Sequence, residues 1–184
     1  GAEMLVDEIR KAISPKKTRS QAWLDLMEDA HSIGLKTTAT MVYGFGETSA
    51  QRVEHFMKVR DLQDKTGGFT AFIPWSFSPN KTKLDCPRLM NGTDYLRIIA
   101  MSRLILDNIP HLQAGWVTEG PDVSQLALQF GADDYGGVLM TEEVVSATGV
   151  DYGVNEDQVI NMIQEAGYVP AQRTTQYDLI RVYE

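Results

Sequence analysis

The segment TTATMVYGFGET, Thr37 to Thr48, sets the fold class of this chain. Its first part, up to Tyr43, is β-branched, apolar and uncharged, which is typical of a strand covered on both faces. Two glycines then turn the chain, and Thr48 can begin a helix through a capping box with Gln51. The segment therefore predicts a buried strand that leads directly into a helix, which ends at Gly67.

The same order of strand and helix recurs further along. The runs FTAFIPWSF (69–77) and HLQAGWVT (111–118) predict two more buried strands, and Pro74 indicates a bulge near the end of the first. The predicted helices run from a Thr18–Gln21 capping box to Gly34, from a Thr93 cap to Pro110, from Pro121 to Gly131, over 141–147, and from an Asn155 cap to Gly167, with 174–184 extended. Strands joined by helical crossovers run parallel.

This alternation, without a G-x-G-x-x-G or Walker loop, favours a barrel over a nucleotide-binding doubly wound sheet. The predicted fold class is α/β, the C-terminal portion of a (β/α) TIM-type barrel with extra C-terminal helices. A whole barrel needs eight units and about 250 residues, so we expect the N-terminal half of the barrel to be missing. We expect barrel units over 1–140 and a helical extension packed on them over 141–184.

The amino-acid composition limits the classes of partner that we expect for this protein. A net charge of −8 opposes broad contact with nucleic acid, and no apolar run reaches the roughly 20 residues of a membrane helix. We therefore expect a cytoplasmic protein without nucleic-acid or membrane partners. The single cysteine, Cys86, cannot form an intrachain disulfide or hold a metal cluster alone. His31, His55 and His111 are too scattered to predict a shared metal site.

Polar residues at the C-terminal ends of the strands are the first candidates for a site, because these ends converge in a parallel barrel. Four places qualify: Glu3, the turn 43–48 with Glu47, the segment 75–80 with Trp75 and Asn80, and Thr118 with Glu119. Each has a structural alternative. Glu3 could simply be solvated, the helix dipole could stabilise Glu47 by roughly 0.3–1 kcal/mol, and the aromatic residues could belong to the core.

Taken together, several segments resemble the dehypoxanthine futalosine cyclase family over nearly the whole chain. They are GAEMLVDEIRKAISPKK (1–17), TTATMVYGFGET (37–48), TGGFTAFIPWSFSPN (66–80), LDNIPHLQAGWVT (106–118), QLALQFGADDYGG (125–137) and PAQR (170–173). The GAE opening and TGGFTAFIP are shared in similar form with aminofutalosine and deazaflavin synthases. GFGET and GADDYGG favour the cyclase family over those sisters.

The resemblance implies that the barrel is of the radical SAM kind and that it performs radical chemistry in menaquinone biosynthesis by the futalosine pathway. In that family a 4Fe-4S cluster, held by a C-x3-C-x2-C motif and fed by an external electron donor, cleaves S-adenosyl-L-methionine (SAM) to a 5′-deoxyadenosyl radical. That radical removes hydrogen from the substrate ribose, the carbon radical attacks the benzoate ring, and oxidation with proton loss gives cyclic dehypoxanthine futalosine. The motif is absent here and Cys86 matches none of its cysteines, so we expect a chain that supplies only the SAM and substrate side.

By the resemblance, Glu3 is the predicted SAM contact. The predicted contacts of the small-molecule substrate, dehypoxanthine futalosine, are Thr40, Tyr43, Glu47, Trp75, Asn80 and Thr118. Two alternatives stay open: a sister radical SAM enzyme of the aminofutalosine or deazaflavin synthase type, and a non-catalytic binding module derived from a barrel. A half barrel exposes two unpaired strand edges, which argues against the second unless another chain covers them.

Overall fold

A parallel sheet forms the centre of the computed structural model, which describes residues 1–80, 82, 84, 88–138, 145–149 and 152–184. Its strands are β1 (Thr37–Tyr43), β2 (Phe69–Ser76) and β3 (His111–Leu112), in that order across the sheet. The β1–β2 pairing runs from Thr37 opposite Phe69 to Tyr43 opposite Ser76. The strands are apolar and joined by helices, so the parallel α/β architecture is confirmed, while the closed barrel stays a prediction.

Two further segments lengthen the sheet at its edges. The carbonyl of Glu3 accepts a hydrogen bond from the Val42 N–H at 2.9 Å, which places the start of the chain beside β1. At the other edge, Gln113 and Asp134 form a parallel bridge, and the Ala114 N–H donates to the Asp134 carbonyl at 2.8 Å. The edge at Asp134 therefore continues the parallel arrangement, and the edge at β1 gains a hydrogen-bonded segment from the start of the chain.

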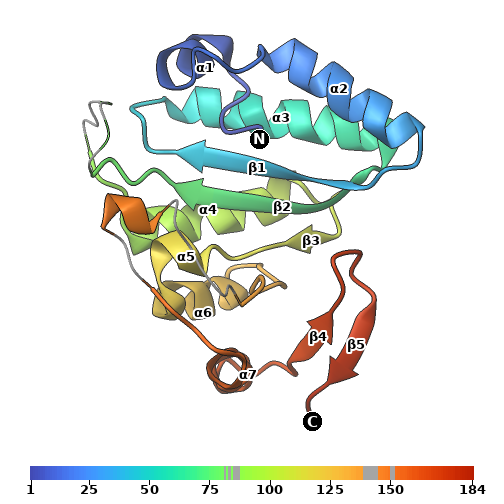
Figure 1. Cartoon of the computed structure of the whole chain (residues 1–184), viewed down its shortest axis with the longest axis vertical. Coiled ribbons are helices and arrows are strands. Elements are labelled where there is room, and N and C mark those ends of the chain that lie inside the picture. The colour runs from blue at the N-terminus through green and yellow to red at the C-terminus, as the bar shows by residue number, and fades with distance from the viewer. Residues whose placement is uncertain (81, 83, 85–87, 139–144, 150–151) are drawn as a thin grey trace.

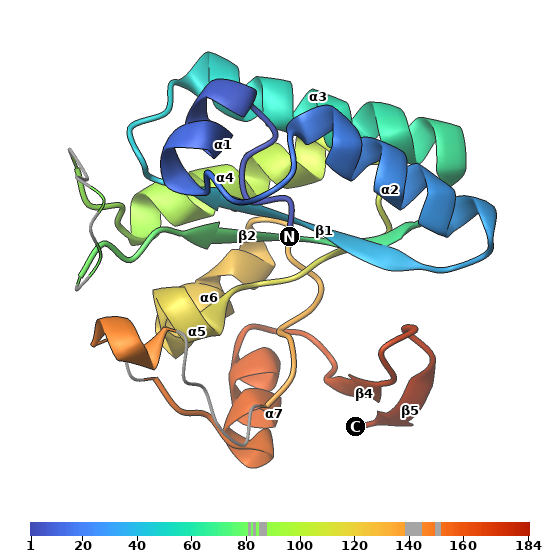
Figure 2. The ribbon, with the colours of Figure 1, turned by 45° about the horizontal axis from the view of Figure 1, so that its top comes forward.

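The helices that accompany this sheet lie partly behind it and partly beyond its two edges (Figures 1 and 2). They are α1 (Asp7–Ile13), α2 (Ser20–Ser32), α3 (Ser49–Thr66), α4 (Gly92–Ile105), α5 (Trp116–Glu119) and α6 (Pro121–Gln129). The short η1 (Ser146–Thr148), α7 (Glu156–Glu165) and an antiparallel hairpin of β4 (Ala171–Arg173) and β5 (Leu179–Val182) follow. In the described part of the chain, no helix is long and apolar enough to cross a membrane.

The capping signals predicted two helix starts correctly and two wrongly. Capping boxes begin α3 at Thr48 and α7 at Asn155, as expected. Thr18 does not cap α2, because the Ser20 N–H donates instead to the Asp7 side chain at 2.7 Å, a partner from α1. Asn91, rather than Thr93, caps α4, which already ends at Ile105.

The predicted bulge near Pro74 is wrong. The one register shift between β1 and β2 lies at Thr37/Thr38, and Pro74 pairs in register with Met41. The Phe77 N–H donates to the Tyr43 carbonyl, so alternation turns the Pro74 nitrogen toward the opposite edge. There β3 has already ended at Leu112, so proline costs no ladder hydrogen bond.

Three features of the sequence analysis fall wholly or mostly on residues that the structure does not describe. The predicted helix 141–147 lies mostly outside the described residues, and η1 occupies its end. The predicted domain boundary at 140/141 and Cys86 lie outside them as well. The predicted extended segment 174–184 contains β5, which forms the second strand of the hairpin.

Candidate functional site

The two faces of the sheet differ in what covers them. On one face the Arg52 guanidinium lies 5.2 Å from the centre of the Tyr43 ring, and Phe72 packs against Phe56 at 5.6 Å. Arg52 and Phe56 both belong to α3, so this is the helix-covered face. Because side chains alternate along a strand, Thr40 and Val42 lie on the opposite face, which a barrel would turn inward.

Two predicted site residues come together on that inward face. A Cβ atom added to Gly1 would lie 2.9 Å from Thr40 Oγ1 and 3.5 Å from Glu3 Oε1. The Glu3 carboxylate and the Thr40 hydroxyl therefore border the same small space. The β1–β2 register sets Thr40 opposite Ile73 and Val42 opposite Trp75, which continues the inward face onto β2.

The Glu3 carboxylate retains a free acceptor atom. Lys17 forms a close ion pair with Oε1, and Arg10 Nη1 lies 3.7 Å from Oε2. Oε2 is buried and has no hydrogen-bond partner among the described residues. The backbone of Glu3 has φ +44°, a left-handed conformation that costs a non-glycine residue free energy. A buried, unsatisfied carboxylate oxygen can accept a hydrogen bond from a ligand hydroxyl or ammonium group.

Tyr43 and Glu47 do not reach the inward face. The Tyr43 ring lies in the helix layer with no exposed surface, and this burial raises the pKa of its phenol far above the usual range. Glu47 accepts hydrogen bonds from the Gly44 and Phe45 N–H groups at 2.9 and 2.8 Å, and from Arg52 Nε at 2.7 Å. Its side chain is fully buried. The geometry favours a structural role for both residues in the turn after β1.

Thr118 does not lie at a strand end, so the predicted strand 111–118 is wrong in its second half. β3 stops at Leu112, and Thr118 belongs to the short helix α5. The chain bends at Gly115, whose N–H donates to the Tyr95 hydroxyl at 2.7 Å. A Cβ atom on Gly115 would lie 2.7 Å from Trp75 Cδ1, so the half-buried indole occupies the space beside the bend.

Asn80, the remaining predicted residue, is exposed in the loop after β2. This loop leads directly into residues that are not described. The structure therefore places Glu3 and Thr40 together, and Trp75 on the neighbouring strand of the same face. It separates them from Tyr43 and Glu47, which serve the helix layer.

Two charged residues near this face were not among the predicted contacts. Glu119 accepts a hydrogen bond from the Ser76 N–H at 2.9 Å, where β3 has ended and left that donor unpaired. Burial raises the pKa of the Glu119 carboxyl, although the Ser76 hydrogen bonds oppose the rise. Arg10 is only 2% exposed. Its helical spacing from Val6 and Ile13 was a signal that it shares the apolar face of α1.

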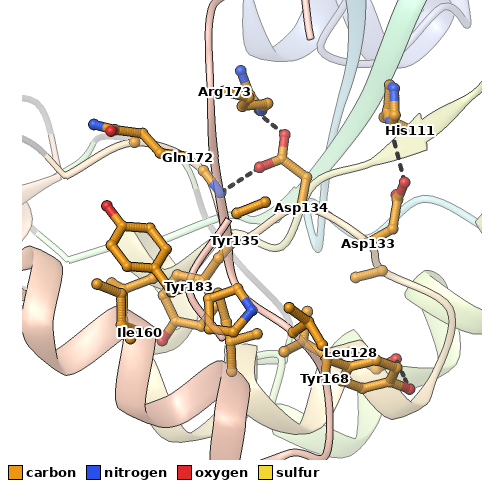
Figure 3. Close-up of a pocket in the computed structure, with 18 of the residues that line it drawn as sticks. His111, Leu128, Asp133, Asp134, Tyr135, Ile160, Tyr168, Gln172, Arg173 and Tyr183 are labelled. Carbon is orange, nitrogen blue, oxygen red and sulfur yellow. Dashed lines mark hydrogen bonds and ion pairs between the residues drawn. The ribbon is translucent and has the colours of Figure 1, made fainter. Parts of the chain in front are cut away.

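A cavity of about 910 Å³ lies elsewhere (Figure 3). His111 begins β3, so the cavity is at the N-terminal ends of the strands, away from the end where barrel enzymes bind substrate. His111 Nδ1 lies 2.7 Å from Asp133, and Arg173 pairs with Asp134. These carboxylates are thus held by protein groups. Within the described ranges, no three His, Cys, Asp or Glu side chains are grouped to hold a metal ion.

A family model and a curated relative both match this chain. Residues 66–184 match the family model described as the CofH/MqnC C-terminal region. Over 184 residues, all of the chain, it is 45% identical to the cyclic dehypoxanthine futalosine synthase of Streptomyces coelicolor, of which it covers 46%.

Two relatives carry other names. The 5-amino-6-(D-ribitylamino)uracil–L-tyrosine 4-hydroxyphenyl transferase 1 of Methanosarcina barkeri is 40% identical over 189 residues, with 98% of this chain and 50% of the relative covered. The aminodeoxyfutalosine synthase of Thermus thermophilus is 36% identical over 190 residues, with 100% and 51% covered. The chain spans about half the length of the curated relatives it matches.

Proposed function

Because the chain belongs to the CofH/MqnC C-terminal region family, we propose that it forms the SAM- and substrate-facing half of a radical SAM cyclase. The proposed reaction converts dehypoxanthine futalosine to cyclic dehypoxanthine futalosine in menaquinone biosynthesis. The observation that carries this proposal is the 45% identity to a synthase of that name along the whole chain. The inward face at Glu3 and Thr40 supports it, because polar groups lie there against a parallel sheet.

Of the two cofactors that the family resemblance implies, SAM fits the residues of this chain and the 4Fe-4S cluster does not. A 4Fe-4S cluster needs several cysteine thiolates, and the sequence has one cysteine, so no step is assigned to cluster ligands of this chain. SAM does fit, because the buried Glu3 Oε2 lacks a hydrogen-bond partner among the described residues and can accept from a ribose hydroxyl or an ammonium group. When bound, SAM supplies the radical that removes hydrogen from the substrate.

The chain's own residues would orient the reactants. Glu3 holds the SAM side, and Thr40 offers a hydroxyl beside it. Trp75 adds a half-buried aromatic surface on the next strand, which can pack against a ring and exclude water. Thr118 on α5 and Asn80 in the loop stay proposed substrate contacts, with Thr118 as a donor toward the benzoate carboxylate. Fixing two reactants in register is the main contribution of the protein to such chemistry.

A sister reaction is the second candidate, because the relatives at 40% and 36% identity carry the names of different enzymes. All three relatives match nearly the whole of this chain, so the extent of the match does not separate the three reactions. The non-catalytic binding module is the remaining alternative. It predicts ligand binding without any conversion.

The test joins this chain to the N-terminal half of the Streptomyces coelicolor synthase and reconstitutes the cluster without oxygen. The hybrid receives dehypoxanthine futalosine, or the substrates of the other two enzymes, in separate reactions with SAM and a reductant. We expect consumption of dehypoxanthine futalosine alone, and a loss of turnover in a Glu3→Gln hybrid. Consumption of another substrate instead would establish a sister enzyme. If a hybrid with an intact cluster bound a substrate without converting it, the non-catalytic binding module would be the remaining interpretation.

A further inference from the structure

The turn that carries Glu3 is held in an unfavourable conformation by buried contacts. Glu3 and Tyr177 are the non-glycine residues with positive φ among those described, and Glu3 has φ +44°. Such backbone persists only where the surrounding structure holds it. The groups that hold this turn therefore decide where the Glu3 carboxylate points.

Arg10 provides most of that hold. Its side chain is nearly inaccessible to solvent, with 3% of its surface exposed. The guanidinium donates to the Ala2 carbonyl through a close contact by Nη1, to the Met4 carbonyl at 3.5 Å, and to the Thr18 carbonyl at 2.6 Å. Ala2 and Met4 flank Glu3 in sequence, so Arg10 fixes the backbone on both sides of it. The planar fork of donors suits arginine and not lysine.

The residue after this turn is anchored to α3. The Leu5 N–H donates to His55 Nδ1 at 3.0 Å, and Lys58 Nζ donates to the Leu5 carbonyl at 2.8 Å. Both partners are side chains of α3, which covers the sheet. The backbone from Ala2 to Leu5 is thus tied to α1 through Arg10 and to α3 through His55 and Lys58.

We propose that Arg10 is a positioning residue, which fixes the left-handed turn and so aims the Glu3 carboxylate at SAM. This inference rests on the proposed function. Lys17 provides the contrast, because it also pairs with the Glu3 carboxylate but from a side chain that is 44% exposed. Lys17 donates its hydrogen bond to the carboxylate, whereas Arg10 donates to the backbone of the turn. Lys17 is an exchangeable counter-ion of Glu3, whereas Arg10 sets its direction.

The experiment measures SAM affinity by equilibrium dialysis on the cluster-loaded enzyme that contains this chain. The variants are Glu3→Gln, Arg10→Lys, Arg10→Met, Lys17→Met and Lys58→Met. We expect Arg10→Met to weaken SAM binding on the order of 10- to 100-fold, since small misplacement of a binding group is costly, and Arg10→Lys to recover part of the loss. Lys17→Met should change it by less than about threefold, because the turn stays intact.

Substrate affinity and urea unfolding are measured on the same proteins, so that damage to the fold is recognised. If Arg10→Met does not fold, Arg10→Lys and Lys58→Met carry the test, and each should weaken SAM binding while leaving substrate affinity unchanged. Equal losses for SAM and substrate, or an effect of Lys17→Met as large as that of the Arg10 variants, would overturn the inference. An unchanged SAM affinity in Glu3→Gln would instead refute the proposed SAM contact. A loss in Glu3→Gln without one in the Arg10 variants would refute only the positioning role.

Discussion

His55 should make the stability of this chain depend on pH. Its side chain is completely buried between Leu5 and the aromatic residues Phe56 and Phe72. Nδ1 accepts the Leu5 N–H, so the hydrogen of the neutral ring is on Nε2, which has no partner among the described residues. Burial, together with the charges of Arg10 and Lys58, lowers the pKa of His55 from 6.5 to about 3.

The sign and size of the effect follow from this shift. Below pH 6.5 the unfolded chain binds a proton that the folded chain refuses, so the free energy of unfolding falls as the pH falls, until the folded pKa is reached. At about 1.4 kcal/mol per pKa unit, His55 removes roughly 2 kcal/mol between pH 8 and pH 5, and on the order of 5 kcal/mol by pH 3. Above pH 7 it contributes no pH dependence.

The assay is urea unfolding at pH 8 and pH 5 for the wild type and His55→Gln, whose amide oxygen can still accept the Leu5 N–H. The wild type should lose roughly 2 kcal/mol more than His55→Gln over this interval. Phe56→Leu is the matched control, because it removes neighbouring core contacts without a titrating group. It should be less stable at both pH values and keep the wild-type difference. If His55→Gln lost as much as the wild type, the assignment of a buried neutral imidazole would be refuted.

Three further changes test the packing around the candidate site. Glu47→Ala removes the carboxylate that accepts from two backbone N–H groups of the turn and pairs with Arg52, so chemical denaturation should show a loss of roughly 3–5 kcal/mol, and a loss below about 1 kcal/mol would contradict the turn role. Gly115→Ala should cost about 1–3 kcal/mol in the same assay, because its Cβ meets Trp75, whereas Gly153→Ala, with open space around it, should stay within about 0.5 kcal/mol; equal effects would exclude the packing argument. Tyr177→Phe loses the hydrogen bond to Asp134 at 2.7 Å, so amide exchange in β4 and β5 should speed up several-fold while that in β1 stays constant.

Local patterns predicted the parts of the fold that depend on local sequence. β1 has the predicted ends, Thr48 and Asn155 cap their helices, and Pro121 occupies the first turn of α6. Each of these features needs only neighbouring residues, such as a β-branched run, a capping side chain or a proline with no N–H to satisfy. The family resemblance is likewise confirmed by the match over residues 66–184.

The sequence-based predictions were wrong where a residue distant in sequence determines the local structure. HLQAGWVT has the composition of a strand throughout, but the Trp75 indole and the Tyr95 hydroxyl hold Gly115 in a bend that ends β3 early. The Ser20 N–H at the start of α2 donates to Asp7 from across a loop, and Thr18 does not cap the helix. Local sequence could not reveal either partner, since both contacts form only after the chain has folded.

At the candidate site, too, some features could be predicted from local sequence and others depend on tertiary contacts. Glu3 and Thr40 could be proposed together because both lie near predicted strand ends. Whether Tyr43 points toward substrate or toward the helices depends on strand register, which fixes the face of every side chain. The register and Arg52 place Tyr43 on the helix side. The contacts of Arg10 with several backbone carbonyls are tertiary and required the structure.

The most direct test of the central claim is the mass of the product made by a cluster-loaded enzyme that carries this chain. The enzyme is incubated with dehypoxanthine futalosine, SAM and a reductant, and the masses of the separated products are measured by mass spectrometry. The proposed cyclisation removes two hydrogen atoms, so we expect a product about two mass units lighter, with one 5′-deoxyadenosine formed for each. Unchanged dehypoxanthine futalosine, from an enzyme that forms 5′-deoxyadenosine with a different substrate, would contradict the proposal.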